Sequence, residues 1–239
     1  MIRLYVTTDL SSGTAVAPTL DQSRYLTQVM RLKLGDELMV FNGRDGEWRC
    51  SIAEVLKKGV LLRAEEQVKP QTTVPDVHLL IAVVKKSALE FAVEKATELG
   101  AARIGLVQTD RTQVQHVRMD RLDAIAIESA EQTGRMDVPV VEAPRRLAEV
   151  LDGWDGSRRL MFCDETGGDP AIAALQAAGA GSWAILIGPE GGFSPDERDR
   201  LRALPCTTAV SLGPRVLRAD TAATTALTLW QAAVGDWAH

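Results

Sequence analysis

The sequence predicts an α/β fold in two parts: a small N-terminal β-barrel over residues 1–70 and an α/β domain with a mostly parallel sheet over residues 74–239. Two changes of pattern indicate this division. Short β-like runs alternate with turn signals up to residue 70, whereas strand-like runs alternate with helical segments from residue 77 onward. Between them, KPQTTVPD at 69–76 carries two prolines and interrupts both periodicities, so we expect a linker there.

The predicted barrel consists of β-like runs at residues 3–6, 37–55 and 59–66. The second run contains the dipeptides Asn42-Gly43 and Asp45-Gly46, which favour hairpin turns. The barrel is therefore expected to be built mainly from hairpins.

One helix is expected among these strands, at SRYLTQVMRLKLGD over residues 23–36. The helical period places Leu26, Val29, Met30 and Leu34 on one face. Gly35 then provides the stop signal.

The α/β domain is read from five strand-like runs and five helical segments. The strands are expected at 77–84, 102–108, 158–164, 182–188 and 207–213, and the helices at 87–100, 119–134, 169–179, 194–204 and 220–237. Ser87 with Glu90 forms a sequence pattern for a capping box. Ser194, Pro195 and Glu197 specify a second helix start.

Composition restricts the function classes. The net charge is −5, with +1 in residues 1–70 and −6 in residues 71–239, so any RNA binding must rest on local basic patches. The three cysteines lie far apart, and His78, His116 and His239 have no ligand spacing, so no metal site is expected. There is no apolar stretch long enough to span a bilayer and no signal-like start, so we expect a cytoplasmic protein without membrane contact.

A glycine-rich turn interrupts the stretch ILIGPEGGFSPDE at 185–197, between a strand-like run and a helix start. Such turns often bind phosphate through backbone N–H groups. This one lacks the lysine of a phosphate-binding P-loop and contains Glu190, which would repel a phosphate. The pattern therefore favours a ligand that is nucleoside-like but not phosphorylated.

A second turn of similar design follows in VSLGPRVLRADTAATTAL at 210–227, where a short strand ends at Gly213-Pro214. If the two strands are neighbours in a parallel sheet, both turns lie at the same edge, where open α/β sheets bind ligands. Two ordinary turns without a ligand remain the alternative.

With EKATELG at 94–100 and SAEQTGR at 129–135, these two stretches make the chain similar to the SPOUT trefoil-knot methyltransferases, and within them to the RsmE family. That family methylates ring N(3) of a uridine in small-subunit ribosomal RNA. Four motifs in the same order, over essentially the whole chain, carry the resemblance. It implies a knotted C-terminal domain, a PUA-like N-terminal barrel, and a homodimer in which the partner completes the site.

The resemblance further implies S-adenosylmethionine as the methyl donor and 16S rRNA or the small ribosomal subunit as the partner. Arg218 is the candidate catalytic residue, because a cation would stabilise the developing uridine anion. The predicted donor-binding residues are Gly188, Pro189, Glu190, Gly191, Gly192, Leu212, Gly213, Leu217, Arg218 and Thr221, with Met161 to Glu165 as a third wall. The predicted RNA contacts are Arg3, Arg24, Arg31, Lys33, Arg44, Arg135 and Arg215.

Three alternatives stay open at this point. Arg218 can instead be a structural partner of Asp220 or Glu190. Asp220 stands where the family usually has Glu, and the shorter side chain favours a helix N-cap over proton transfer. For the whole chain, the alternatives are a non-catalytic RNA-binding or ribosome-assembly factor of the same fold and a methyltransferase acting on tRNA ribose.

Overall fold

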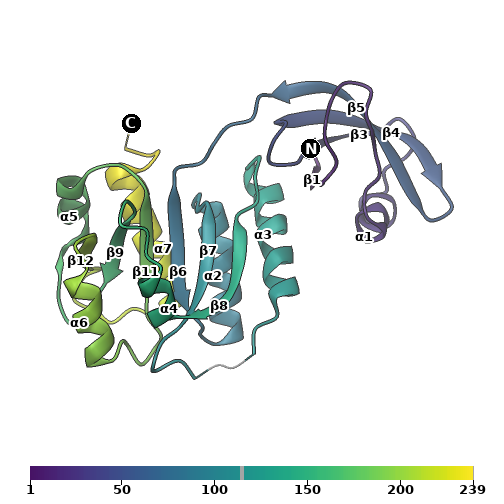
Figure 1. Ribbon diagram of the computed structural model, residues 1–239. Helices are drawn as coiled ribbons and strands as arrows, with labels where there is room; N and C mark the ends of the chain where they lie inside the picture. The colour runs from purple at the N-terminus through teal and green to yellow at the C-terminus, as the bar shows by residue number, and fades with distance from the viewer. Residues whose placement is uncertain (114–115, 239) are drawn as a thin grey trace. The chain divides into compact units, whose positions relative to one another are not determined.

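The computed structural model describes residues 1–113 and 116–238, and His239 of the histidine argument lies outside them (Figure 1). The chain divides into two compact units. The first comprises Met1–Thr73 with Ala130–Val138, and the second comprises Val74–Ser129 with Pro139–His239. Residues 130–138, which the sequence analysis assigned to the second domain, therefore belong to the first unit.

The first unit is built on a five-stranded sheet of order β1-β3-β4-β5-β2. Its strands are β1 (Arg3–Tyr5), β2 (Ala15–Val16), β3 (Glu37–Phe41), β4 (Glu47–Leu56) and β5 (Gly59–Lys69). β1 is parallel to β3, and the other pairs are antiparallel. Register shifts along the β4–β5 ladder increase its twist around a core that includes Leu38, Ile52 and Leu62.

The helix of this unit differs from the expectation. It begins earlier, as α1 (Leu20–Arg24) with Thr19 as N-cap, and continues as one π-helical turn, η1 (Tyr25–Val29). The wider turn moves the following residues off the predicted face, because a π-helix pairs residues five apart. Leu26 is fully buried, but Val29 is 67% and Leu34 66% exposed.

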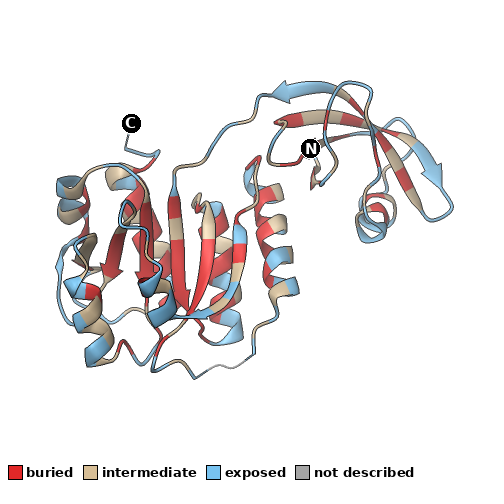
Figure 2. Cartoon of the chain, in the orientation of Figure 1, coloured by how far each residue is buried: buried red, intermediate tan, exposed pale blue. Residues whose placement is uncertain are grey.

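The second unit contains a seven-stranded parallel sheet of order β10-β12-β9-β11-β6-β7-β8. The strands are β6 (Val77–Ala82), β7 (Arg103–Gln108), β8 (Val140–Arg146), β9 (Arg159–Cys163), β10 (Asp169–Pro170), β11 (Trp183–Ile187) and β12 (Thr207–Ser211). Every residue of β11 is buried, as expected for a parallel strand with both faces covered (Figure 2).

Helices cover both faces of this sheet. They are α2 (Lys86–Glu98), α3 (Met119–Thr133), α4 (Leu147–Asp152), α5 (Ala171–Ala178), α6 (Pro195–Ala203) and α7 (Ala219–Val234). α7 packs between α2 and α5 and against β6 and β11. On the opposite face, Leu151 of α4 and Leu201 of α6 join Leu186 of β11 in one core.

Two local predictions for this unit are wrong. No helix or strand was expected between residues 135 and 157, where the structure has β8 and α4. β8 is an edge strand that contains Pro144, and its ladder with β7 shifts register at that point, which hides the alternating pattern. The N-cap of α2 is Lys85 without a side-chain hydrogen bond, so Ser87 lies inside the helix instead of capping it.

Within residues 1–113 and 116–238, no helix is long and apolar enough to cross a membrane. The same part of the chain contains no group of three or more His, Cys, Asp or Glu side chains arranged to hold a metal ion.

Candidate functional site

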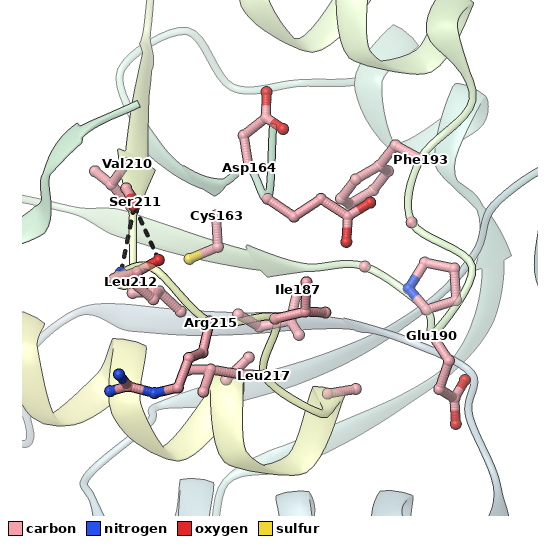
Figure 3. Close-up of a pocket in the computed structure, with 18 of the residues that line it drawn as sticks. Cys163, Asp164, Ile187, Glu190, Phe193, Val210, Ser211, Leu212, Arg215 and Leu217 are labelled. Atoms are coloured by element: carbon pink, nitrogen blue, oxygen red, sulfur yellow. Dashed lines mark hydrogen bonds between the residues drawn. The ribbon is translucent and has the colours of Figure 1, made fainter. Parts of the chain in front are cut away.

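Three strand ends of the second unit form one cavity. β12, β9 and β11 are neighbours and parallel, so the turns that follow them meet at the carboxyl edge of the sheet. The cavity spans about 800 Å³ of space, which includes open solvent. β9 stands between β12 and β11, so the two glycine-containing turns share an edge of the sheet without following adjacent strands, and the β9 turn forms the middle wall (Figure 3).

Most predicted donor-binding residues come together here. The cavity is lined by Gly188, Pro189, Glu190, Gly192, Leu212, Gly213 and Leu217. Gly191, Arg218 and Thr221 are outside the lining, whereas Arg215, predicted as an RNA contact, is part of it. Sequence reasoning did not identify Ile187, Phe193, Val210, Ser211, Pro214, Val216, Ala219 and Ala222, which also line the cavity. Many of these are apolar residues that only their place beside the two turns could have suggested.

The turn after β11 favours glycine at two positions, Gly188 and Gly192. A Cβ at Gly188 would lie 2.6 Å from the Phe193 ring, which packs edge-on against Phe162 with 5.2 Å between ring centroids. Gly192 has φ +68°, and a Cβ there would collide with the Glu165 carboxylate. Its N–H donates to the Pro189 carbonyl at 2.9 Å. Because Gly188 and Gly192 have no side chains, the backbone of the turn faces the cavity.

The start of α6 fixes the far end of this turn, and here the prediction is confirmed. The Ser194 hydroxyl accepts from the Glu197 N–H at 3.3 Å, and the Glu197 carboxylate accepts from the Ser194 N–H at 2.9 Å. Pro195 occupies the first helical position. The turn therefore ends on a complete capping box.

The middle wall, from β9, presents Cys163, Asp164 and Glu165. The Asp164 side chain is 1% exposed and accepts from Arg202 Nη2 at 2.6 Å and from the Thr166 N–H at 2.9 Å. Burial alone would raise the pKa of Asp164, but these hydrogen bonds outweigh it and the net pKa is lowered. Burial raises the pKa of the Cys163 thiol to about 12.

The turn after β12 is more open. Gly213 donates its N–H to the Ser211 hydroxyl at 3.3 Å (Figure 3). Val216 is 80% exposed, and Arg215 is exposed with no hydrogen bond or ion pair to the described part of the chain. In Figure 3 the Arg215 and Glu190 side chains extend toward opposite ends of the cavity.

Arg218 and Asp220 differ from their predicted positions. The N-cap of α7 is Arg218, which makes no side-chain cap, and Asp220 is the second helical residue. The N-cap role expected for Asp220 is therefore wrong. Its carboxylate accepts from the Thr221 N–H at 2.8 Å and lies 3.9 Å from Arg218 Nε. The Arg218 side chain is 72% exposed.

Two of the predicted RNA-binding arginines make internal contacts of the first unit. Arg3 donates to Glu47 at 2.5 Å and to the Ala130, Glu131 and Arg135 carbonyls, and its side chain is 13% exposed. Arg135 is buried and paired with Asp137. The partners of Arg3 are distant in sequence, whereas Arg135 pairs with a near neighbour. Both guanidinium groups are occupied within the first unit, so we assign them structural roles in place of RNA contact.

The other predicted basic contacts of this unit stay accessible. Arg24 is 67% exposed beside Asp21, and Arg44 is 53% exposed with its guanidinium on Asp9. Arg31 and Lys33 are exposed in the bend after η1. Two aromatic side chains of this unit could stack on bases: Tyr25 is 37% exposed, and Trp48 is partly buried with its Nε1 donating to the Asp45 carbonyl.

The chemistry of the cavity suits an unphosphorylated nucleoside with a positive group. Its lining holds one guanidinium, from Arg215, against the carboxylates of Asp164, Glu165 and Glu190. Backbone N–H and C=O groups at the glycine turns can read a base edge, and Ile187, Leu212 and Leu217 supply apolar surface. Phosphate would meet mostly negative charge.

Comparisons with known proteins agree with this geometry. The RNA methyltransferase domain family matches residues 70–231, and the RNA methyltransferase PUA domain matches residues 18–65. The chain is 32% identical to the ribosomal RNA small subunit methyltransferase E of Rickettsia conorii, over 94% of this chain and 93% of that protein. It is 33% identical to the protein of the same name from Synechocystis, over 94% and 75%.

Two solved structures share the fold over almost their whole length. A putative methyltransferase from Legionella pneumophila, solved with bound S-adenosylmethionine, has a TM-score of 0.87 at 31% identity and 98% coverage of both chains. A ribosomal RNA small subunit methyltransferase E from Neisseria gonorrhoeae has a TM-score of 0.88 at 24% identity and 99% coverage of both. The predicted fold class is thereby confirmed, and the chain belongs to the RsmE family of RNA methyltransferases.

Proposed function

We propose that this chain transfers a methyl group from S-adenosylmethionine to ring N(3) of a uridine in 16S rRNA. The observation that carries the proposal is the cavity at the ends of β9, β11 and β12, in a member of this family. Its bare glycine turn and acidic lining fit a donor that contains adenosine and a sulfonium but no phosphate.

The donor is held, in this proposal, by backbone groups of residues 188–192 and 211–213 and by the apolar side chains between them. The bound donor supplies an electrophilic methyl group. The Gly188 and Gly192 positions support this assignment, because a side chain at either would disturb the walls of the cavity. Gly191 and Thr221 adjoin the cavity without lining it, so we place them in supporting positions.

Methylation at N(3) also requires that the uridine lose the N(3) proton, whose pKa is well above neutral. A cation close to the ring stabilises the anion that develops. We assign this role to Arg218, which is exposed next to the cavity and only loosely paired with Asp220 at 3.9 Å. Arg215, which lines the cavity and has no partner in the described chain, is assigned to an RNA phosphate.

RNA is bound, in addition, by the exposed basic residues of the first unit, Arg24, Arg31, Lys33 and Arg44. The match of residues 18–65 to the PUA domain of RNA methyltransferases supports this use of the surface. We further propose that the enzyme is a homodimer that acts in the cytoplasm, with the second copy covering the open side of the cavity near Val216, which is 80% exposed.

The test is methyl transfer from labelled S-adenosylmethionine to naked 16S rRNA and to small ribosomal subunits that lack the modification. Digestion to nucleosides and mass spectrometry should identify N(3)-methyluridine in at least one substrate. Label at another atom would disprove the N(3) assignment. Donor binding by calorimetry without transfer to either substrate would instead support a non-catalytic RNA-binding factor.

The roles of the two arginines make a matched pair of variants. We expect Arg218→Ala to lower kcat by about 100-fold, since one preorganised electrostatic contact to a transition state contributes about 10² to 10³. Arg215→Ala should instead raise the KM for RNA and reduce its salt dependence. Unchanged kcat in Arg218→Ala would remove this residue from the mechanism.

Sedimentation at micromolar concentration tests the homodimer in the same samples.

A further inference from the structure

The turn that follows β7 lies against the glycine turn although 80 residues separate them in sequence. Residues 109–112 form a tight turn, in which the Thr112 N–H donates to the Thr109 carbonyl at 3.0 Å and the Thr109 N–H donates to the Thr112 hydroxyl at 2.9 Å. In the sheet, β6 stands between β7 and β11, so the turn reaches across the end of β6. It does not line the donor cavity.

Asp110 of this turn closes a ring of hydrogen bonds with the capping box of α6. Its N–H donates to Glu197 Oε1 at 2.9 Å, and its carboxylate accepts from the Ser194 hydroxyl at 2.7 Å. The other two bonds of the ring are those between Ser194 and Glu197. The residue that ends the glycine turn is therefore bonded both to its own helix and to the β7 turn.

Arg111 fixes the middle of the glycine turn. Its Nη1 donates to the Gly191 carbonyl at 2.8 Å, and its Cβ lies 3.6 Å from the position that a Cβ of Gly191 would occupy. The side chain thus lies alongside the backbone of the glycine turn. Gly191 itself has no side chain to hold its peptide in one orientation.

We propose that Asp110 and Arg111 are positioning residues for donor binding, which hold residues 188–194 in the conformation that faces the cavity. The inference rests on the proposed function for the identity of the ligand. Preorganisation of a binding loop contributes affinity because the ligand does not have to order it. Loss of either contact should therefore weaken donor binding without removing any group that touches the donor.

The experiment measures donor affinity by calorimetry and amide hydrogen exchange of residues 188–194 in the ligand-free protein. Arg111→Ala is expected to weaken S-adenosylmethionine binding about tenfold and to speed exchange in this segment, while the unfolding temperature changes little. Arg111→Lys can still donate to the Gly191 carbonyl and should recover to within about threefold of the parent protein. Asp110→Ala should resemble Arg111→Ala, and Asp110→Asn, which keeps an acceptor for Ser194, should remain close to the parent.

Arg118→Ala is the matched control, since Arg118 is also an exposed arginine but pairs with Asp120 at the start of α3. Parent-like exchange and affinity in Arg111→Ala, or a lysine variant no better than alanine, would overturn the proposal. In a methyl-transfer assay of Arg111→Ala, the KM for the donor should rise, while the KM for RNA and kcat stay near the parent values. If the parent protein bound no donor but Arg111→Ala still sped exchange, the proposed function would fail and the positioning contact would stand.

Discussion

The two glycine-containing turns of the cavity differ in how they are held. The turn after β11 is fixed by the Phe193 ring, by the capping box of α6 and by hydrogen bonds from the β7 turn. The turn after β12 has the Ser211–Gly213 contact, and α7 starts without a side-chain cap. Preorganised groups contribute affinity. We therefore expect the first turn to be the fixed half of the proposed donor site, and the second to be the half that adjusts to ligand, RNA or partner.

The largest expected effect on donor affinity comes from one of a matched pair of glycine substitutions, one in each turn. Gly188→Ala would press a Cβ to within 2.6 Å of Phe193, and overpacking of this kind costs about 1 to 3 kcal/mol. We expect donor affinity to fall more than tenfold, together with a lower unfolding temperature. Calorimetry and thermal unfolding measure both.

Gly213→Ala is the matched substitution in the second turn. Gly213 has φ +111°, so alanine is strained there, but nothing lies within 4 Å of its Cβ and the exposed turn can relax. Its effect on donor affinity should be several-fold smaller than that of Gly188→Ala. A larger effect of Gly213→Ala would reverse the assignment of fixed and adjustable halves.

Local signals explain why the fixed half was predictable. Ser194, Pro195 and Glu197 act within four residues of one another, and they form the predicted capping box. The same local reasoning failed for Asp220, because the N-cap of α7 is Arg218, two residues earlier than the Asp220 side chain suggested. An N-cap can be predicted from sequence only when the residue with the capping side chain also stands at the N-cap position of the helix.

Contacts between distant residues account for what the sequence could not provide. Nothing in the pattern shows that β9 stands between β11 and β12, or that Arg111 reaches Gly191. Arg3 looked like a surface cation, but its guanidinium binds Glu47 and carbonyls at the end of α3, all distant in sequence. Arg135 pairs with its near neighbour Asp137, and its burial depends on the packing around it. Strand order and buried ion pairs depend on tertiary packing, which periodicity does not encode.

The second expected effect is on the free energy of unfolding, and it concerns Asp164 in the middle wall between the two turns. Asp164 carries a lowered pKa, because its hydrogen bonds from Thr166 and Arg202 outweigh the opposing effect of burial. A carboxyl whose pKa is lower in the folded state stabilises the fold above its unfolded pKa of about 3.9 and loses this contribution as pH falls through the folded value. Asp164→Asn removes the charge and leaves Arg202 without its anion.

We therefore expect Asp164→Asn to lower the free energy of unfolding by about 1 to 3 kcal/mol at pH 7, as for removal of a buried hydrogen-bonded charge. The difference from the parent should begin to shrink below about pH 4, where the carboxyl of the unfolded parent protonates, and should disappear as the pH falls through the lowered pKa of the folded state. Urea unfolding at several pH values measures it. Asp155→Asn is the control, since Asp155 also has a lowered pKa, from Ser157, but lies on the surface. Equal pH profiles for the two variants would contradict a special role of the middle wall.

The smallest expected effect is on the alkylation rate of Cys163, whose thiol reports on the turn after β12. Cys163 pairs in register with Val210 at the end of β12 and lines the cavity. Burial raises its pKa to about 12, so little of the thiol is ionised at pH 8 and alkylation should be slow. Reaction then depends on brief opening of the second turn, which increases both access and ionisation.

Bound donor should slow alkylation of Cys163 by a few-fold further, because it closes the second turn over the middle wall. Cys50 is the internal control: its pKa is also raised to about 12 by burial, but it lies in the sheet of the first unit and should not respond to donor. Mass spectrometry of the individual peptides separates the two thiols. If donor protects Cys163 and Cys50 equally, the whole chain has become more stable; if it protects only Cys163, the motion belongs to the turn after β12. Only the second outcome is consistent with one fixed and one adjustable half.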